Sequence, residues 1–170
     1  WQPLEALYGW GAHMEDYMNL RGKELYLCQH NLKAMVPVLN STAGYGLLFD
    51  AGCAMMFKDN SEGSFVELEA AKQIDYYFMK GKTMDAVVAN YRLLTGNSPM
   101  MPLYLFGYIQ SKERYVSSDD LINTLKEYRQ RQIPIDMIVQ DWNYWPEGQW
   151  GNMSMNLKFY PDKRKLVDEI

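Results

Sequence analysis

The feature that most constrains this fold is a strand–helix–strand pattern in the last part of the chain. Two apolar runs, Leu103–Gln110 and Ile135–Asp141, flank an amphipathic segment, Ser117–Gln132. Apolar strands joined through a helix are typical of a parallel sheet, because parallel strands need a long crossover connection. Two parallel strands cannot bury their own faces, so we expect the sequence to stop within a larger sheet.

Capping residues predict where the helices begin and end. Ser117 is a suitable N-cap for the helix between the two runs, with Asp120 in the place of the capping-box acid. Thr83 and Gly96 mark the start and the end of an earlier helix with one apolar face. Pro161 is expected to open a third helix near the end of the chain.

The first part of the chain has the pattern of an antiparallel β-sandwich, with short strands separated by Gly, Asn and Asp. The predicted strands are Glu24–Gln29, Ala34–Asn40, Tyr45–Asp50, Ala54–Lys58, Phe65–Ala70 and Gln73–Met79. The polar run Asp59–Gly63 predicts a hairpin turn. We therefore divide the chain into a sandwich portion (1–82), a helical linker (83–102) and the start of a parallel α/β domain (103–170).

Composition excludes several classes of function. The chain has 170 residues and a net charge of −4, without the basic stripe of a nucleic-acid-binding protein. No apolar run approaches the ~20 residues that span a bilayer. The two cysteines are too few for a disulfide framework or a zinc cluster. Aromatic residues make up 14%, which fits either a well-packed core or a carbohydrate-binding surface.

The candidate functional residues follow the two apolar runs, because sites in parallel sheets lie at the carboxyl ends of the strands. Asp141 ends an apolar strand face and is followed by Trp142, Trp145 and Trp150, a combination that suits a sugar. Alternatively, Asp141 caps a loop and the tryptophans belong to the core. The charged run 112–114 is either a solvated surface or part of the same pocket. Asp136, at the start of its strand, is interpreted as a turn or salt-bridge residue.

Several strings of this sequence resemble glycoside hydrolase family 31. Gln110–Tyr115 reads QSKERY and is similar to the first-strand motif of the α-xylosidase-like branch. The string IPIDMIVQDWNYW at Ile133–Trp145 resembles the second barrel strand of that branch. Tyr91–Gly96 and Gly44–Asp50 continue the likeness upstream, so that it extends along nearly the whole chain.

The resemblance implies an α+β chain: an antiparallel β-sandwich portion followed by the first two βα units of a (β/α)8 barrel. It implies a retaining α-glycosidase for α-glucosides or α-xylosides that works by double displacement without a cofactor or metal. Both catalytic carboxylates would lie on later strands, outside this chain. Asp141 would bind sugar hydroxyls, Trp142 would line the pocket and Glu113 would lie near it. The loop that begins at His13 would approach from the sandwich, although Ala12 stands where the family usually has Gln.

Two other interpretations stay open at this point. The same aromatic residues would suit a non-catalytic carbohydrate-binding module, and an interaction scaffold without a sugar site is the third possibility. The expected partners are a glycoside substrate and the remainder of the parent barrel, with no nucleic acid and no membrane. We also expect the isolated chain to be catalytically inactive and to self-associate through its unpaired strands.

Overall fold

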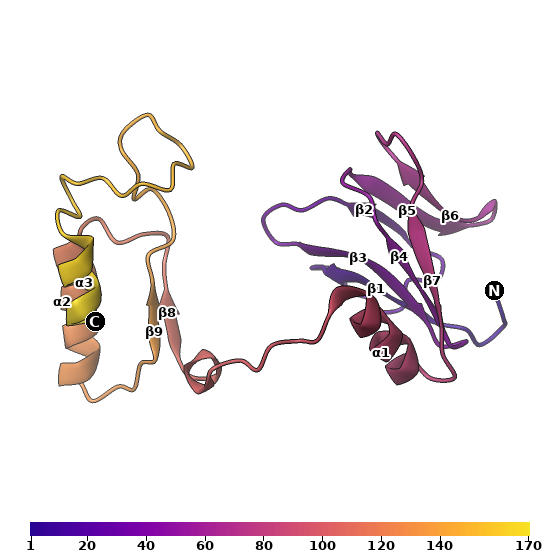
Figure 1. The fold of residues 1–170 in the computed structure, drawn as a ribbon, viewed down its shortest axis with the longest axis horizontal. Helices are drawn as coiled ribbons and strands as arrows, with labels where there is room; N and C mark the ends of the chain where they lie inside the picture. Colours follow the sequence, from indigo (N-terminus) through magenta and orange to yellow (C-terminus); the bar gives the residue numbers. More distant parts are fainter. The chain divides into compact units, whose positions relative to one another are not determined.

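The computed structural model describes all 170 residues as two compact units, Trp1–Ser98 and Pro99–Ile170 (Figure 1). The first unit contains two antiparallel sheets and one α-helix, and the second contains a parallel strand pair and two α-helices. Helix α1, which we predicted within a linker, packs on a sheet of the first unit. None of the helices combines the length and the apolar character that a membrane-spanning helix needs.

The first unit has a four-stranded and a three-stranded sheet. The larger sheet has the order β1-β3-β4-β7, with β1 at Leu7–Ala12, β3 at Ala34–Ser41, β4 at Tyr45–Phe49 and β7 at Tyr76–Lys80. The smaller sheet has the order β2-β5-β6, with β2 at Glu24–Leu27, β5 at Met55–Asn60 and β6 at Gly63–Leu68. All pairs are antiparallel. The six predicted strands are present with shifted ends, and the predicted hairpin is confirmed, although its turn is only Ser61 and Glu62 because Asp59, Asn60 and Gly63 belong to the strands. Strand β1 was not predicted from its pattern.

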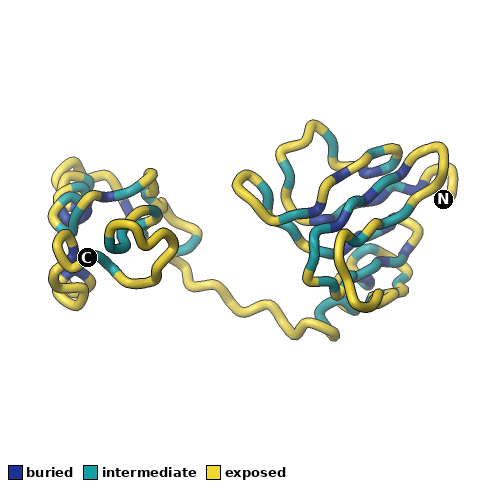
Figure 2. The backbone as a smooth tube through the Cα atoms, turned by 90° about the horizontal axis from the view of Figure 1, so that it is seen from above, coloured by how far each residue is buried: buried dark blue, intermediate teal, exposed yellow.

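Side chains from both sheets form one core, which lies along the dark segments of the first unit in Figure 2. Trp10 is fully buried there, with its ring centroid 5.7 Å from that of Phe49 and 5.8 Å from that of Phe57. Strand neighbours point to opposite faces, so Leu39 enters this core while Val38 faces the other way. Val38 packs against Val87 of helix α1 (Met84–Thr95), which therefore covers the outer face of the larger sheet.

A β-bulge in β1 gives Trp10 its position. The register of β1 against β3 shifts between Gly9 and Gly11, and Gly9, Trp10 and Gly11 all have positive φ angles, 131°, 61° and 91°. A Cβ atom at Gly9 would lie 2.2 Å from the Val38 carbonyl oxygen, and one at Gly11 would lie 1.8 Å from that of Ala34. Both flanking positions therefore require glycine, and the buried indole compensates for the strained φ of Trp10.

Asp59 joins distant parts of the first unit through its carboxylate. The group is buried and accepts hydrogen bonds from Trp1 Nε1 (2.8 Å), Arg21 Nε (3.0 Å), the Gly22 N–H and the Ser64 hydroxyl. Burial by itself would raise the pKa of Asp59, but these four donors outweigh it and lower the pKa to about 2. The ionised form of Asp59 is thus part of the folded structure.

The second unit contains β8 (Ile109–Ser111), α2 (Ser118–Gln130), β9 (Met137–Val139) and α3 (Lys163–Glu169), preceded by a 3₁₀ turn at Leu103–Phe106. The predicted strand Leu103–Gln110 is therefore wrong over its first part. Leu103 is 86% exposed and Phe106 is 77% exposed, because the short β8–β9 pair has no neighbouring strand that would cover them.

The core of the second unit forms where the two helices meet the loops that follow the strands. Its buried residues are Tyr115, Leu121, Ile122, Tyr160 and Leu166. Tyr160 donates a hydrogen bond from its hydroxyl to the Tyr115 carbonyl, and the Ser118 N–H donates to the Phe159 carbonyl over 3.0 Å.

The helix caps of the chain agree with three of the four predicted ends. Thr83, Gly96 and Ser117 cap as expected. Asp120 accepts from the N–H of Val116 rather than from that of Ser117, so the capping box is shifted by one residue. Asp162 is the N-cap of α3, whereas Pro161 had been expected to open that helix, because the Asp162 carboxylate accepts from the Lys165 N–H.

Asp136 holds the beginning of the parallel pair together. Its Oδ2 accepts from the Tyr108 N–H over 2.9 Å, and its own N–H donates to the Tyr108 carbonyl over 3.0 Å. A Cβ atom at Gly107 would lie 2.1 Å from the same Oδ2. The carboxylate thus occupies the space that a side chain at position 107 would need.

We predict that Gly107→Ala weakens the second unit by displacing the Asp136 carboxylate and leaving the Tyr108 N–H without its acceptor, a loss of about 1–3 kcal/mol. Urea unfolding monitored by tryptophan fluorescence measures the change. Gly52→Ala is the matched control, since nothing lies within 4 Å of a Cβ atom there and its φ is not positive. Equal unfolding free energies for wild type and Gly107→Ala would contradict the prediction.

The Asp59 contribution to stability depends on pH. Because its pKa in the folded chain, about 2, is lower than the ordinary value of 3.8, the contribution is complete above about pH 4. It declines as the pH falls from there through 2. We expect Asp59→Asn to lower the unfolding free energy of the first unit at pH 7 and to reduce this pH dependence in urea titrations. Asp16→Asn, at an exposed position, should leave both unchanged.

Candidate functional site

The parallel pair brings the two predicted strand-end segments to the same edge. Ser111 of β8 pairs with Val139 of β9. Beyond this pair, the N–H of Trp142, three residues after Val139, donates over 3.2 Å to the carbonyl of Glu113, two residues after Ser111. The ladder therefore continues past the strands proper, with Glu113 beside Asp141 in the extended register.

Asp141 lies at this edge with its side chain exposed. In the extended register it follows Met137 and Val139 on one face of β9. Its carboxylate makes no hydrogen bond and no ion pair within the chain, so the alternative of a loop-capping Asp141 has no bond to support it. A free carboxylate at a strand end can accept two hydrogen bonds from an external donor.

Three tryptophans form an edge-to-face cluster directly after Asp141. Ring centroids are 5.6 Å apart between Trp142 and Trp150 and 5.5 Å between Trp145 and Trp150. Trp150 is 77% exposed, and none of the three belongs to the buried core of the unit. The alternative that these tryptophans are core residues is therefore wrong for this structure. They present an aromatic surface of the kind that packs against sugar rings.

The charged run 112–114 separates into three different environments. Lys112 Nζ lies 3.6 Å from Asp120 Oδ2 and 4.3 Å from the centroid of the Tyr115 ring, so its role is structural. Arg114 places its guanidinium 5.7 Å from the centroid of the Trp142 ring. Glu113 is exposed. Arg114 therefore contacts the tryptophan cluster, although the sequence analysis named it only as part of the charged run 112–114.

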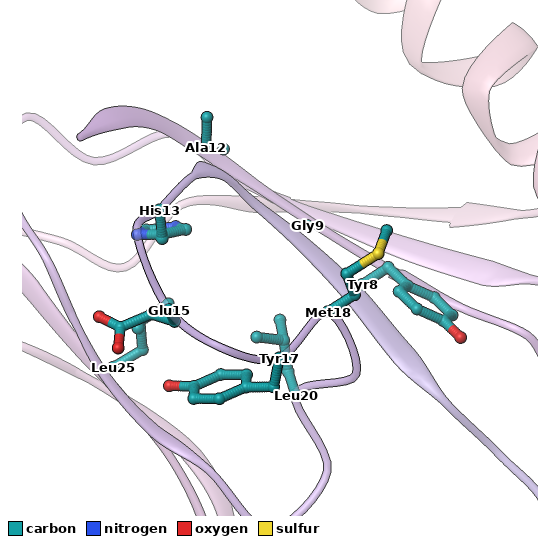
Figure 3. Close-up of a pocket in the computed structure, with 10 residues that line it drawn as sticks. Tyr8, Gly9, Ala12, His13, Glu15, Tyr17, Met18, Leu20 and Leu25 are labelled. Atoms are coloured by element: carbon teal, nitrogen blue, oxygen red, sulfur yellow. The ribbon is translucent and has the colours of Figure 1, made fainter. Parts of the chain in front are cut away.

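His13 belongs to the first unit, whereas the other three predicted site residues belong to the second. It lines a hollow of about 230 Å³ between β1 and the loop that follows it, together with Glu15, Tyr17 and Leu25 (Figure 3). His13 Nε2 lies 2.5 Å from the Trp10 carbonyl oxygen, which can only accept, so Nε2 carries the proton. Nδ1 is buried and has no partner.

The signals for these site features differ in kind. Asp141 and Trp142 follow an apolar run, and this local pattern predicts that they lie at the end of a strand. The stacking of Arg114 on Trp142 joins residues on separate loops, and only the β8–β9 register brings them together. The structure contains no group of three or more His, Cys, Asp or Glu residues that would suit a metal ion.

Comparison with known proteins links this geometry to one family. The sequence model of the "Glycosyl hydrolases family 31 TIM-barrel domain" matches residues 98–170. An "Alpha-xylosidase" of Saccharolobus solfataricus is 35% identical over 98% of this chain and 24% of its own length. "Alpha-xylosidase A" of Aspergillus niger is 26% identical over 99% of this chain and 23% of its own length. The chain thus spans about a quarter of these relatives.

Solved structures agree with this relationship. A family 31 alpha-xylosidase from a soil metagenome, in complex with xylose, superposes with a TM-score of 0.83 and 30% identity. The superposition covers 99% of this chain and 25% of that one. The alpha-xylosidase of Xanthomonas citri has a TM-score of 0.81 at 21% identity, over 100% of this chain and 35% of its own, which is a likeness of fold. Residues 98–170 thus match the barrel domain of glycoside hydrolase family 31, and the whole chain resembles family 31 alpha-xylosidases in sequence and in fold.

Proposed function

We propose that the complete protein is a retaining α-glycosidase that acts on α-xylosides or α-glucosides, and that this chain supplies part of its sugar-binding site. The observation that carries the proposal is the unpaired Asp141 carboxylate at the carboxyl end of β9, beside Trp142. Relatives of this chain are named alpha-xylosidases, and one structural relative holds xylose. A free carboxylate beside partly exposed indole rings suits the hydroxyls and the C–H face of such a sugar.

In this proposal the strands β8 and β9 are the first two of a (β/α)8 barrel, and the sandwich precedes it. The nucleophile and the acid/base lie on later strands outside this chain, and they carry out the double displacement. Asp141 accepts two charge-assisted hydrogen bonds from sugar hydroxyls and so fixes the ring for attack at its anomeric carbon. No cofactor takes part, because two carboxylates suffice for this reaction.

Trp142 and Glu113 are the other proposed binding residues near Asp141. Trp142 covers one side of the sugar, and its orientation is fixed by the backbone bond to Glu113 and by the Arg114 guanidinium over its ring. Glu113 offers a second exposed carboxylate at the adjacent strand end. His13, in the first unit, is the last proposed binding residue, and the contact of its Nε2 with the Trp10 carbonyl orients its ring.

We predict that Asp141→Ala in the complete enzyme lowers kcat/KM for aryl α-xylosides or α-glucosides by two to four powers of ten. Two charge-assisted bonds contribute about 1.5–3 kcal/mol each, at about 1.4 kcal/mol for every power of ten. Asp136→Ala is the matched control, because it removes a carboxylate from the opposite end of the same strand. It should lower the melting temperature and largely preserve kcat/KM, since Asp136 bonds the Tyr108 backbone.

Both variants are measured for kinetics and for melting temperature in the same buffer. The assignment of the active end of β9 is wrong if Asp136→Ala abolishes turnover in a folded enzyme while Asp141→Ala retains it.

We predict that the isolated chain, residues 1–170, does not turn over aryl α-glucosides or α-xylosides. Apart from Glu113 and Asp141 it has no carboxylate pair at neighbouring strand ends, and neither residue matches the nucleophile or the acid of the family. A discontinuous assay on the purified chain tests this. Turnover that persists through repurification and disappears in Asp141→Ala would overturn the proposal. Sugar binding by a complete protein that never turns over any glycoside would instead favour a carbohydrate-binding module.

A further inference from the structure

A second hollow lies in the second unit, beside Asp141 but not lined by it. It measures about 370 Å³, at the lower end of the usual range for small-molecule sites. Its walls come from the loop after β8 and from the segment between β9 and α3. The side chains that matter for binding are Arg114, Asn143, Trp145, Glu147, Lys158 and Phe159. The hollow was not indicated by any motif in the sequence.

Within the 170 residues of this chain, the two cations of the hollow have no anionic partner. The seven ion pairs of the chain involve neither Arg114 nor Lys158. Each instead lies over an aromatic ring: Arg114 is 5.7 Å from the Trp142 centroid, and Lys158 Nζ is 5.3 Å from the Phe159 centroid. Glu147 lines the same hollow without pairing with either cation. Both positive charges are thus unpaired within this chain and can pair with an external anion.

The remaining polar groups of the hollow are mostly donors as well. The side-chain amide of Asn143 is exposed, and Asn156 uses its Oδ1 to accept from the Lys158 N–H, which leaves its NH₂ group free. Trp145 and Phe159 add aromatic faces. Donors and cations beside aromatic faces select a ring that carries many acceptors and a negative charge.

We infer that this hollow binds a sugar unit that bears a carboxylate, a uronic acid, as a subsite separate from the one around Asp141. The Arg114 guanidinium pairs with the carboxylate, and the planar fork of arginine matches both of its oxygens. Lys158 adds a second positive charge, the asparagine amides donate to ring hydroxyls, and Trp145 covers the ring. The inference concerns binding only and does not require the proposed glycosidase activity.

Calorimetric titration of the 170-residue chain with methyl α-D-glucuronide tests the inference, with methyl α-D-glucoside and acetate as the other two probes. We expect the glucuronide to bind at least about tenfold more tightly than the glucoside, because the neutral sugar leaves both cations unpaired. Acetate should also bind more weakly than the glucuronide, because it has no ring. Raising the salt concentration should weaken glucuronide binding.

Variants connect the binding to the named cations. Arg114→Gln and Lys158→Gln should each weaken glucuronide binding at least about tenfold, whereas Arg164→Gln and Lys163→Gln, on exposed helix α3, should not change it. Lys158→Gln leaves the tryptophan cluster untouched, so its effect does not depend on Trp142. Arg114→Lys should bind more tightly than Arg114→Gln but more weakly than the wild type. Lysine keeps the positive charge but cannot donate two parallel hydrogen bonds to the carboxylate.

Equal binding of glucoside and glucuronide, equal binding of acetate and glucuronide, or no binding of any probe would each overturn the inference. So would unchanged affinity in both Arg114→Gln and Lys158→Gln. These outcomes are distinguishable from a failure of the proposed function, which is decided by turnover of the complete enzyme and by Asp141→Ala.

Discussion

The second unit depends on one buried contact, the hydrogen bond from the Tyr160 hydroxyl to the Tyr115 carbonyl. Tyr115 follows β8, and Tyr160 ends the long segment after β9. The bond therefore connects the two segments that follow the strands into one frame. A parallel pair of three-residue strands has too few ladder bonds to do this alone. Glu113 and Arg114 on one side, and Asp141 on the other, keep their positions because this frame is closed.

Two carboxylates illustrate how the protein separates structural from available charge. Asp59 is surrounded by four donors within the protein. These hydrogen bonds stabilise its ionised form and lower its pKa to about 2. Asp141 has no protein donor and lies exposed at a strand end. A satisfied carboxylate resists protonation but has little capacity left for a ligand. The unsatisfied one contributes nothing to folding and keeps its full capacity for hydrogen bonding.

The features that the sequence predicts are those that depend on residues close together in the chain. The caps at Thr83 and Ser117 are local, and the sequence predicted them correctly. Strand β1 was missed because Gly9 and Gly11 interrupt its alternation, and the apolar run from Leu103 was taken for a strand whose covering neighbours are absent. At the candidate site, the position of Asp141 follows from its strand. The hollow beside Arg114 depends on loops that meet only through long-range pairing, which no local pattern encodes.

The bulge at Trp10 has a consequence for how the chain tolerates changes in length. On its N-terminal side the register against β3 is fixed by Leu7 and Ser41, and the indole anchors the strand from within the core. On its far side the strand leads into the loop that carries His13. The structural effect of an insertion or deletion in that loop should therefore not extend past Trp10, so the strands of the sandwich keep their register. Changes in length are best tolerated at the exposed residues Met14–Asp16, between His13 and the residues Tyr17 and Leu20 that pack on the core.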